Sequence, residues 1–347
     1  MSQGRIWTFA FLFHVVVGAA AAAPEHGVGV RSMTASAPVR GEPIELTVWY
    51  PTDAKGPAEI VGGSKVFKGT PALRNAPVFK GQYPVIVLAH GGFRAAPHHE
   101  GWIASSLAAR GYIVGVTRPP ALGPKDAKSA VQELWLRPAD LSAALTALES
   151  DPVISPRIMP GKAAAVGFFL GGTSALALAG ARLDPNSYGR SCDRHEAGLD
   201  CAWFVRGGVD LKRIGAADLG RSHRDERIKA VIAVDPELST SFSPESLAGI
   251  GIPVDIINLG SPGTIAPALE VSGLKVHIPD SRYGAIPDAT SFSAFNPCTP
   301  DGPALLREEG DDDAICRDGG TRPREEIHRE IAGRITDALH QSLSAWP

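Results

Sequence analysis

The sequence predicts an α/β fold with a mostly parallel central sheet and helices on both faces. Short continuous apolar runs, such as residues 84–89 and 229–234, alternate with longer helical segments along the chain. At residues 163–181 an apolar strand, a glycine-flanked turn and a small-residue helix follow one another without a spacer. Continuous apolar runs are typical of parallel strands buried on both faces, and alternation of strand and helix builds such a sheet.

Length and composition suit one globular domain. The chain has 347 residues, of which 44% are hydrophobic and 20% charged. We expect residues 24–347 to form a single domain, since α/β proteins of this size often do not divide. The formal net charge is −3 and no basic stripe stands out, so nucleic acid is not an expected partner.

Residues 1–23 are interpreted as a signal peptide. Arg5 precedes the apolar run 6–17, and the alanines at 20–23 supply a cleavage site. The alternative is an uncleaved anchor, but His14 and Gly18 interrupt the run and leave it short for a membrane span. We therefore expect export to a periplasm or out of the cell, with no transmembrane anchor after the leader is removed.

Four cysteines lie after the leader: Cys192, Cys201, Cys298 and Cys316. An even count in an exported chain predicts two disulfides. The favoured pairing joins Cys192 to Cys201 and Cys298 to Cys316, because each bond closes a short polar loop without apolar periodicity. Free buried thiols are the alternative. The spacings match no zinc pattern, and the sequence suggests neither a metal nor a cofactor.

The first elements are predicted to be strands. Residues 28–34 and 44–50 alternate apolar and polar side chains, as half-buried antiparallel strands do. The Gly/Pro-rich stretch 51–83 is interpreted as a long connection. Residues 84–89 form a continuous apolar run, predicted to be a central parallel strand, which stops at the His-Gly-Gly sequence 90–92.

Helices and strands then alternate. We expect a helix over residues 98–110, ended by a glycine, then a strand over 112–116. A longer helical region covers 128–149, with Pro138 as a candidate break at which Asp140 starts a new turn.

The second half of the chain begins with an interruption of this alternation. Residues 184–227 are polar and glycine-rich, and we interpret them as a cap or lid insertion, with a disordered linker as the alternative. Strands are predicted at 229–234, 254–259 and 274–278. The final helix, about 324–343, is amphipathic, with one apolar face formed by residues four apart: Ile327, Ile331, Ile335 and Leu339.

The turn within residues 163–181 has the form of a nucleophile elbow. In this motif a strained corner between strand and helix raises one side chain above the sheet, and the crowded backbones require small residues. Gly167, Gly171 and Gly172 meet that requirement, but the central position is Phe169. A phenyl ring cannot attack a carbonyl carbon, so the nucleophile expected at this turn is missing.

These motifs together resemble the α/β-hydrolase superfamily. The evidence is the order of elements, the His-Gly-Gly loop, RPAD at 137–140, the GFFLGG elbow and the aspartate in AVIAVDPEL. Within the superfamily the chain is most similar to bacterial dienelactone-hydrolase-like proteins and platelet-activating-factor acetylhydrolases, from about residue 44 to the last helix. The resemblance implies an α/β-hydrolase fold and, if the site is active, carboxylic-ester hydrolysis by serine, aspartate and histidine.

The resemblance assigns each catalytic role to a position of this chain. The nucleophile position is Phe169 and the acid position is Asp235, after the strand 229–234. The histidine of a P-x-A-G-H-F-like turn corresponds to Ser291. The backbone N–H groups of Gly92 and Leu170 correspond to the oxyanion donors. Two of the three triad side chains are therefore replaced.

Structural roles are the alternatives for the remaining polar residues. Asp235 then caps a loop or pairs with an arginine, and His90 holds its turn. His98, His99 and Glu100 are adjacent and project in different directions, which favours a solvated helix start over a metal site.

Three hypotheses on function follow. The first is a non-catalytic pseudo-hydrolase that keeps a pocket and binds a small ester, a lipid or a protein partner. The second is an active carboxylic-ester hydrolase or lyase in which Ser291 is a relocated nucleophile and His90, His98 or His99 is the base. The third is a structural or interaction protein with a collapsed pocket. An apolar cavity above Phe169 would count against the third hypothesis, and filled space there would favour it.

Overall fold

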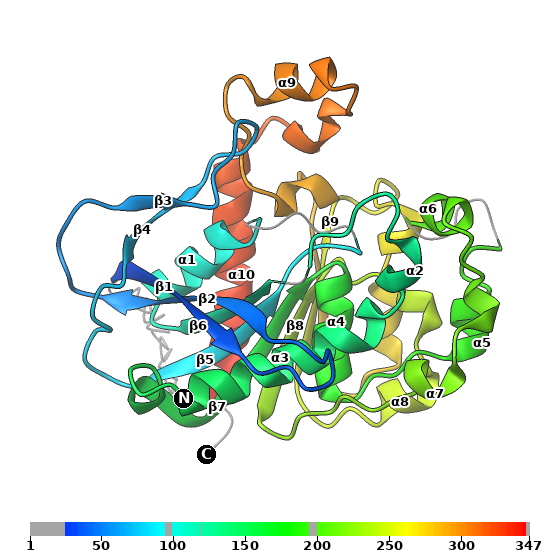
Figure 1. The fold of residues 1–347 in the computed structure, drawn as a ribbon, viewed down its shortest axis with the longest axis horizontal. Coiled ribbons are helices and arrows are strands. Elements are labelled where there is room, and N and C mark those ends of the chain that lie inside the picture. The colour runs from blue at the N-terminus through cyan, green and yellow to red at the C-terminus, as the bar shows by residue number, and fades with distance from the viewer. Residues whose placement is uncertain (1–24, 94–98, 119, 194–199, 345–347) are drawn as a thin grey trace, which may run out of the picture.

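The computed structural model describes residues 25–93, 99–118, 120–193 and 200–344 (Figure 1). The predicted leader lies outside these residues. The described chain forms a ten-stranded sheet of order β10-β9-β8-β7-β5-β6-β2-β1-β4-β3. The neighbours from β10 to β6 pair in parallel, whereas β2 pairs antiparallel with both β6 and β1. The predicted mostly parallel sheet is confirmed.

Strands β1 to β5 follow one another in sequence without a helix, and from β5 to β9 strands alternate with α-helices. The strands are β1 (Gly27–Ala35), β2 (Ile44–Thr52), β3 (Glu59–Val61), β4 (Thr70–Arg74), β5 (Tyr83–Ala89), β6 (Ile113–Arg118), β7 (Ile158–Phe168), β8 (Ile228–Val234), β9 (Val254–Leu259) and β10 (Ser281–Ile286). The α-helices are α1 (Gly101–Ala109), α2 (Ala127–Ala130), α3 (Glu133–Ser150), α4 (Leu170–Ala179), α5 (Pro185–Gly189), α6 (Cys201–Arg206), α7 (Ala216–Leu219), α8 (Pro244–Ala248), α9 (Gly302–Glu308) and α10 (Arg324–Ser344).

Helices cover both faces of the sheet, as predicted (Figure 1). On one face α3 and α4 pack against each other and against β5, and on the other α1 packs with α10. Each face has its own buried apolar core. The predicted apolar face of α10 is fully buried in the second core. The spacing of four residues therefore identified the face of the helix that packs against the sheet.

The predicted strand at 274–278 is wrong. Residues Ser272–Val276 form a 3-10 helix, and the last strand is β10, which pairs with β9 from Ser281 onward. A strand here would place Leu274, Val276 and Ile278 on one face. Leu274 and Ile278 are buried but Val276 is 80% exposed, which fits a helical turn, where residues four apart share a face.

Two other sequence predictions need correction. The stretch 51–83, interpreted as a connection, contains β3 and β4 at the sheet edge. The helical region is interrupted at 131–132 and not at Pro138, which lies within the continuous helix α3. Pro138 is only five residues from the start of α3, so its missing N–H removes a single early hydrogen bond.

The segment between α4 and β8 contains the short helices α5, α6 and α7, which Figure 1 places together beside the sheet. Tyr188 of α5, and Trp203 and Phe204 of α6, are buried against the core shared with α3 and α4. Trp203 Nε1 also donates a hydrogen bond to the carbonyl of Pro124 at 2.9 Å. This part of the predicted insertion is therefore packed against the body of the molecule.

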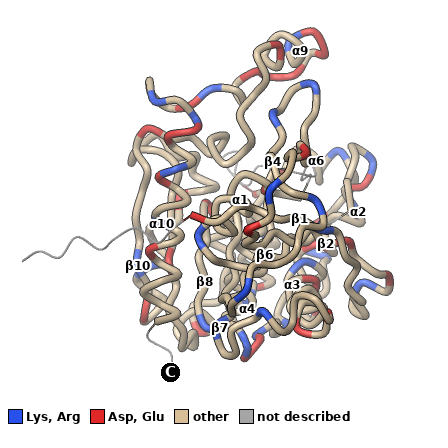
Figure 2. The backbone as a smooth tube through the Cα atoms, turned by 90° about the vertical axis from the view of Figure 1, so that its left-hand side faces the viewer, with Lys and Arg blue, Asp and Glu red and all other residues tan. Residues whose placement is uncertain are grey.

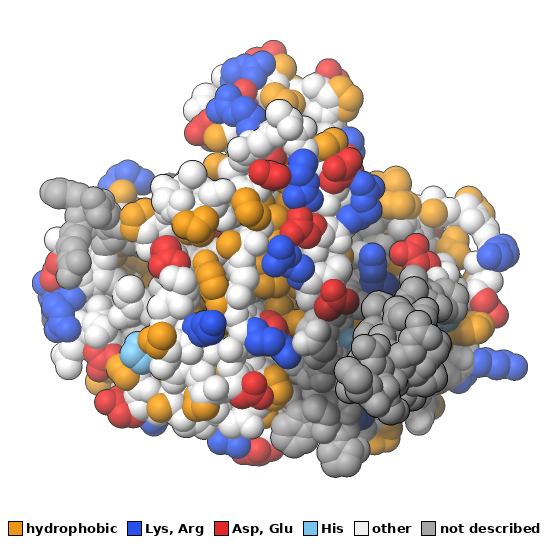
Figure 3. Space-filling model, turned by 180° about the vertical axis from the view of Figure 1, so that it is seen from behind, with side chains coloured by type: hydrophobic (Ala, Val, Ile, Leu, Met, Phe, Trp, Pro, Cys, Tyr) orange, Lys and Arg blue, Asp and Glu red, His pale blue; other side chains and the backbone are white. Residues whose placement is uncertain are grey.

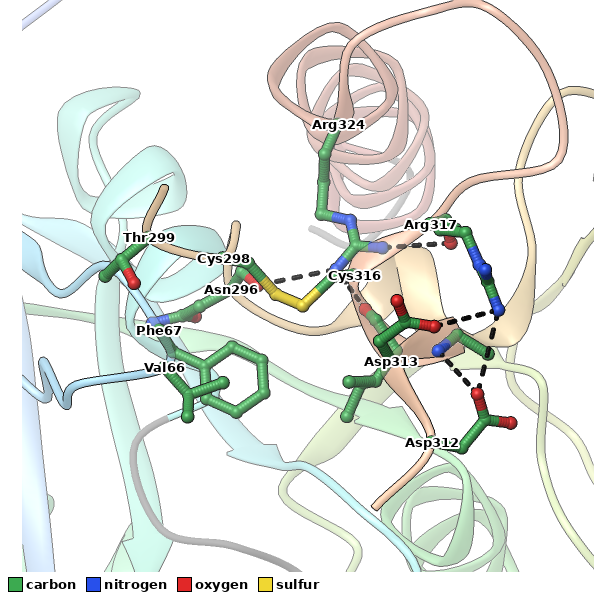
Figure 4. The surroundings of a disulfide bond; sticks show 12 residues. Val66, Phe67, Asn296, Cys298, Thr299, Asp312, Asp313, Cys316, Arg317 and Arg324 are labelled. Carbon is green, nitrogen blue, oxygen red and sulfur yellow. Dashed lines mark hydrogen bonds and ion pairs between the residues drawn. A yellow bond between two sulfur atoms is a disulfide. The ribbon is translucent and has the colours of Figure 1, made fainter. Parts of the chain in front are cut away.

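Both predicted disulfides are present, joining Cys192 to Cys201 and Cys298 to Cys316. The second closes the segment that carries α9, which projects from the body at the top of Figure 1. Figure 4 shows Arg324 of α10 beside this bond, where its guanidinium donates to the carbonyls of Ile315 and Arg317 at 2.7 and 3.1 Å. The base of the projecting segment is therefore fixed by a covalent bond and by a buried arginine.

Charges of both signs are interspersed along the chain (Figure 2) and over the face seen in Figure 3, with hydrophobic side chains between them. Among the residues that the structure describes, no helix has both the length and the apolarity needed to span a membrane.

Candidate functional site

Phe169 occupies the corner between β7 and α4. Its backbone has φ 57° and ψ −126°, a conformation that side chains other than glycine rarely adopt. The Phe169 N–H donates to the carbonyl of Val234 at 3.0 Å, which ties the corner to the end of β8. The strained turn predicted from the glycine pattern is therefore present, with a phenylalanine at its centre.

The glycines of the turn are required by backbone crowding. A Cβ on Gly167 would lie 2.0 Å from the carbonyl oxygen of Gly171, and a Cβ on Gly171 would lie 2.2 Å from that of Ala89. The nearest atom to a Cβ on Gly172 is Cβ of Pro236, at 3.1 Å. Strand and helix therefore approach so closely that the first two positions exclude any side chain.

The ring of Phe169 is enclosed by other aromatic rings. It stacks on Phe295, with ring centroids 5.6 Å apart, and meets the ring of His90 edge-on at 5.8 Å. Only 5% of Phe169 is exposed. The space above the corner is thus occupied by the Phe169 side chain and its neighbours.

His90 holds the segment that follows β10. Its Nε2 donates to the carbonyl of Ala294 at 3.0 Å, and Trp102 donates to the same oxygen at 2.9 Å. Burial lowers the pKa of His90 to about 3, and nearby His99 acts in the same direction. His90 is therefore neutral at physiological pH, with one nitrogen committed to the backbone. His99 packs between the rings of Phe67 and Phe295, and His98 lies outside the described residues.

Asp235 lies directly after β8, as predicted, and is fully buried. Its Oδ1 accepts hydrogen bonds from Asn258 Nδ2 at 2.8 Å and from the N–H of Leu259 at 2.9 Å. Its Oδ2 is buried without a hydrogen-bond partner in the described structure. Burial raises the pKa of Asp235 from 3.8 to about 7, against the two hydrogen bonds, which lower it. The carboxyl thus has one satisfied and one unsatisfied oxygen.

Ser291 begins the 3-10 turn Ser291–Ala294 and is partly exposed. None of the described histidines forms a hydrogen bond with its hydroxyl, since His90 and His328 donate to backbone carbonyls of this segment. Ser291 lines a cavity of about 200 Å³ together with Leu259 and Leu269. Leu259 lines this cavity and also donates its N–H to Asp235, so one residue links the cavity wall to the buried carboxyl.

The loop after β5 lies against the start of α4. The N–H of Gly171 donates to the carbonyl of Gly91 at 3.3 Å. The predicted oxyanion donors are the chain neighbours of these two glycines: Gly92 follows Gly91, and Leu170 precedes Gly171. Arg137 of α3 supports the loop by donating to the carbonyls of Gly91 and Phe93 at 3.1 and 3.3 Å.

Arg137 belongs to a buried set of charges that includes the RPAD sequence. Its Nε pairs with Glu133 at 3.2 Å, and Arg40 bridges Glu133 and Asp140 at 2.8 and 2.5 Å. Paired in this way, the charges can be buried, and they fix the loop that carries Gly92.

Glu237 is a site residue that the sequence reasoning did not identify. A Cβ on Gly92 would lie 2.7 Å from its Oε1, so the carboxyl touches the loop after β5. Burial raises the pKa of Glu237 to about 8, Asp200 adds to the rise, and Arg137 opposes it. The only available signal was its position two residues after Asp235.

Within the described part of the chain, no group of three or more His, Cys, Asp or Glu side chains is arranged to hold a metal ion. The described site therefore consists of a strained corner filled by Phe169, a buried carboxylic acid, a serine at the edge of a cavity and a braced glycine loop.

Comparison with known proteins bears on the fold. No protein-family model and no curated protein matches the chain. The structure is similar to a ferulic acid esterase from Streptomyces cinnamoneus, with a TM-score of 0.61 and 17% identity over 95% of this chain and 94% of that one.

Two further similar structures are less close. A dienelactone hydrolase from Anabaena variabilis gives a TM-score of 0.44 and 13% identity over 82% of this chain and 96% of that one. A dienelactone-hydrolase-like promiscuous phosphotriesterase from metagenomic libraries gives a TM-score of 0.49 and 13% identity over 90% of this chain and 99% of that one. With its sheet order, its strained corner and the esterase-like arrangement of its elements, the chain has the α/β-hydrolase fold.

Proposed function

We propose that this chain is a non-catalytic member of the dienelactone hydrolase and acetylhydrolase type, which acts by binding. One observation carries the proposal: Phe169 stands at the strained corner where a nucleophile is needed. Its ring has no group that can attack a carbonyl, and it fills the volume that a substrate carbonyl would enter.

The acid and base positions support the same conclusion. Asp235 Oδ2, which would orient a catalytic histidine, has no hydrogen-bond partner among the described residues. The residue at the base position is Ser291, whose hydroxyl is not an effective proton acceptor at neutral pH. An acid without a base, and a base position without basicity, cannot activate a nucleophile.

A relocated site receives no support. Ser291 would need a histidine nitrogen within about 3.5 Å of its hydroxyl, allowing for a loose ligand-free geometry. His90 instead donates to Ala294 and lies among the rings of Phe168, Phe169 and Phe295.

The cavity beside Ser291 is the place we propose for a ligand. Its volume of about 200 Å³ is suited to a small ester and not to a long lipid chain. Its described lining combines apolar side chains with hydroxyl groups, and none of these lining residues is charged. We propose that the Ser291 hydroxyl donates to the carbonyl oxygen of an uncharged ligand. The filled space above Phe169 favours the structural alternative, so the proposal of binding rests on this separate cavity.

Export is part of the proposal. The two disulfides support an oxidising compartment, because such bonds rarely persist in a reducing cytosol. N-terminal sequencing of the secreted or periplasmic protein would test the expected cleavage near residue 23. Recovery of the intact N-terminus from the cytosol would contradict it.

The decisive experiment is hydrolysis of short and medium p-nitrophenyl esters by the purified chain, with the Asp235→Ala variant beside it. We expect both proteins to give the background rate. A rate well above background that is lost in Asp235→Ala would show a working triad and overturn the proposal. An Asp235→Asn variant controls for loss of folding, since it keeps the shape of the carboxyl.

A further inference from the structure

A cavity of about 360 Å³ lies between β4, α1 and α10. Helix α1 packs against both β4 and α10, below the projecting segment that carries α9 (Figure 1). The volume is within the range of small-molecule sites. Among the described residues, this cavity shares no lining residue with the one beside Ser291. It is therefore a separate candidate site.

Part of the cavity wall is apolar and fixed in place. Pro71, Pro297 and Trp102 supply the apolar surface. Trp102 stacks on His328 with ring centroids 3.6 Å apart, and its Nε1 donates to the carbonyl of Ala294 at 2.9 Å. His328 also lines the cavity but is neutral at physiological pH, because burial lowers its pKa to about 4. This part of the wall thus offers an apolar surface without charge.

The Thr70 hydroxyl in the same wall has no hydrogen-bond partner among the described residues. Thr70 is the first residue of β4 and is only 8% exposed. A Cβ on Gly101 would lie 2.9 Å from its Oγ1, so the hydroxyl faces the start of α1. A buried hydroxyl without a partner is costly, and it retains one donor. An acceptor group bound in the cavity would use that donor and remove the cost.

The charged side chains that line the cavity are Lys68, Glu325 and Arg329. Lys68 and Glu325 pair with each other at 3.2 Å. Arg329 lies 3.7 Å from Glu326, which is outside the lining, and forms no hydrogen bond with any described residue. Both side chains of that pair are well exposed, at 71% and 48%, and such pairs contribute little stability. The N–H donors of the Arg329 guanidinium therefore remain available to a ligand.

We propose that this cavity binds a small carboxylic acid in its ionised form. The carboxylate accepts hydrogen bonds from the Thr70 hydroxyl and from the Arg329 guanidinium, whose planar donors match two carboxylate oxygens. The apolar body of the acid packs against Trp102 and the two prolines. A cation would instead meet two positive side chains, with Glu325 already paired. The inference depends neither on the Phe169 corner nor on the ligand proposed for the cavity beside Ser291.

The test is isothermal titration of the purified chain with sodium benzoate at neutral pH and constant ionic strength. The matched probe is benzamide, which has the same planar shape but no charge. The variants are Arg329→Gln and, as a control on the same helix, Arg334→Gln, which loses the same charge outside the cavity. Thr70→Val removes the unpartnered hydroxyl and keeps a branched side chain suited to a strand. Urea unfolding of each variant is measured beside its titration.

We expect saturable benzoate binding, at least about tenfold weaker binding of benzamide, and unchanged benzoate affinity in Arg334→Gln. Affinity in Arg329→Gln should fall about tenfold or more, because a charged hydrogen bond is lost. Thr70→Val should bind benzoate more weakly while its urea midpoint stays equal or rises, since the free chain loses no hydrogen bond.

Three results would each overturn the proposal. They are the absence of saturable benzoate binding to the original chain, equal affinity for benzoate and benzamide, and unchanged benzoate affinity in Arg329→Gln. A lower urea midpoint in Thr70→Val with unchanged affinity would also contradict it, because the hydroxyl would then be used within the protein. Ester hydrolysis by the original chain would overturn the proposed function and leave this inference standing.

Discussion

Phe169 and Phe295 stack with their ring centroids 5.6 Å apart and their planes 23° apart. The first residue stands at the strained corner between β7 and α4, and the second follows the turn where a catalytic histidine is expected. Phe295 lies four residues after Ser291, the base position, so an apolar stack joins the nucleophile position to the segment that carries the base position. This contact stabilises the fold in the place where an active enzyme would keep an open site.

The backbone strain at Phe169 predicts an unusual order of stabilities. Replacing a buried phenylalanine by alanine costs about 3–5 kcal/mol. Glycine removes the same ring but relieves a left-handed conformation worth about 1–3 kcal/mol. We therefore expect Phe169→Gly to be more stable than Phe169→Ala by about 1 kcal/mol, measured by urea denaturation. Phe168, buried in β7, is the control: there glycine should be worse than alanine. The same order at both positions would contradict the strain.

Restoring both missing groups should create esterase activity. In Phe169→Ser with Ser291→His, we expect the new histidine to donate to Oδ2 of Asp235, which has no partner in the described structure, and to accept the serine proton. We expect the double variant to hydrolyse p-nitrophenyl acetate above background and both single variants to remain at background. A serine without its base is a poor nucleophile. Activity in Phe169→Ser alone would show that another residue serves as the base.

The crowding at the corner predicts that Gly171 cannot be replaced. A Cβ there would lie 2.2 Å from the backbone oxygen of Ala89, which cannot move without distorting β5. Gly171→Ala should therefore lose several kcal/mol of stability, on the order of a large overpacking effect. Gly251→Ala is the control, because no heavy atom lies within 4 Å of its Cβ position. Similar urea midpoints for the two variants would contradict the close approach of strand and helix.

The interior of the sheet was predictable from sequence, whereas its edges were not. Strands β5 and β8 are buried on both faces, so their side chains form continuous apolar runs. The edge strands β10 and β3 are mostly exposed or partly exposed and have no such run. Leu274 and Ile278 are four residues apart, so they lie on one face both in a strand and in a helical turn. Their apolar character therefore did not distinguish the two structures.

The strained corner of the site was predictable because local backbone geometry dictates its residues, and the place of Asp235 followed from the end of β8. Gly167 and Gly171 are fixed by contacts within a few residues and with one neighbouring strand, so the motif is visible in the sequence. The place of Glu237 depends on how the loop after β8 packs on the loop after β5. No local pattern records that packing.

The buried carboxyl of Asp235 predicts a pH dependence of stability. Its pKa is raised from 3.8 to about 7, so between these values the folded chain keeps a proton that the unfolded chain has lost. The stability that Asp235 contributes is therefore complete below about pH 4 and declines as the pH rises through 7. A difference of this size corresponds to roughly 4 kcal/mol.

Asp235→Asn isolates this effect, because the amide keeps the acceptor used by Asn258 and Leu259 but does not titrate. Urea unfolding of both proteins from pH 4.5 to 8 is the measurement. The buried histidines, whose pKa values are lowered, give the opposite slope and cancel in the comparison. We expect the variant to gain stability relative to the original chain as the pH rises. If the difference in stability between the two proteins stays constant with pH, Asp235 ionises as an ordinary exposed carboxyl does. That result would contradict a buried carboxyl with an unpartnered oxygen.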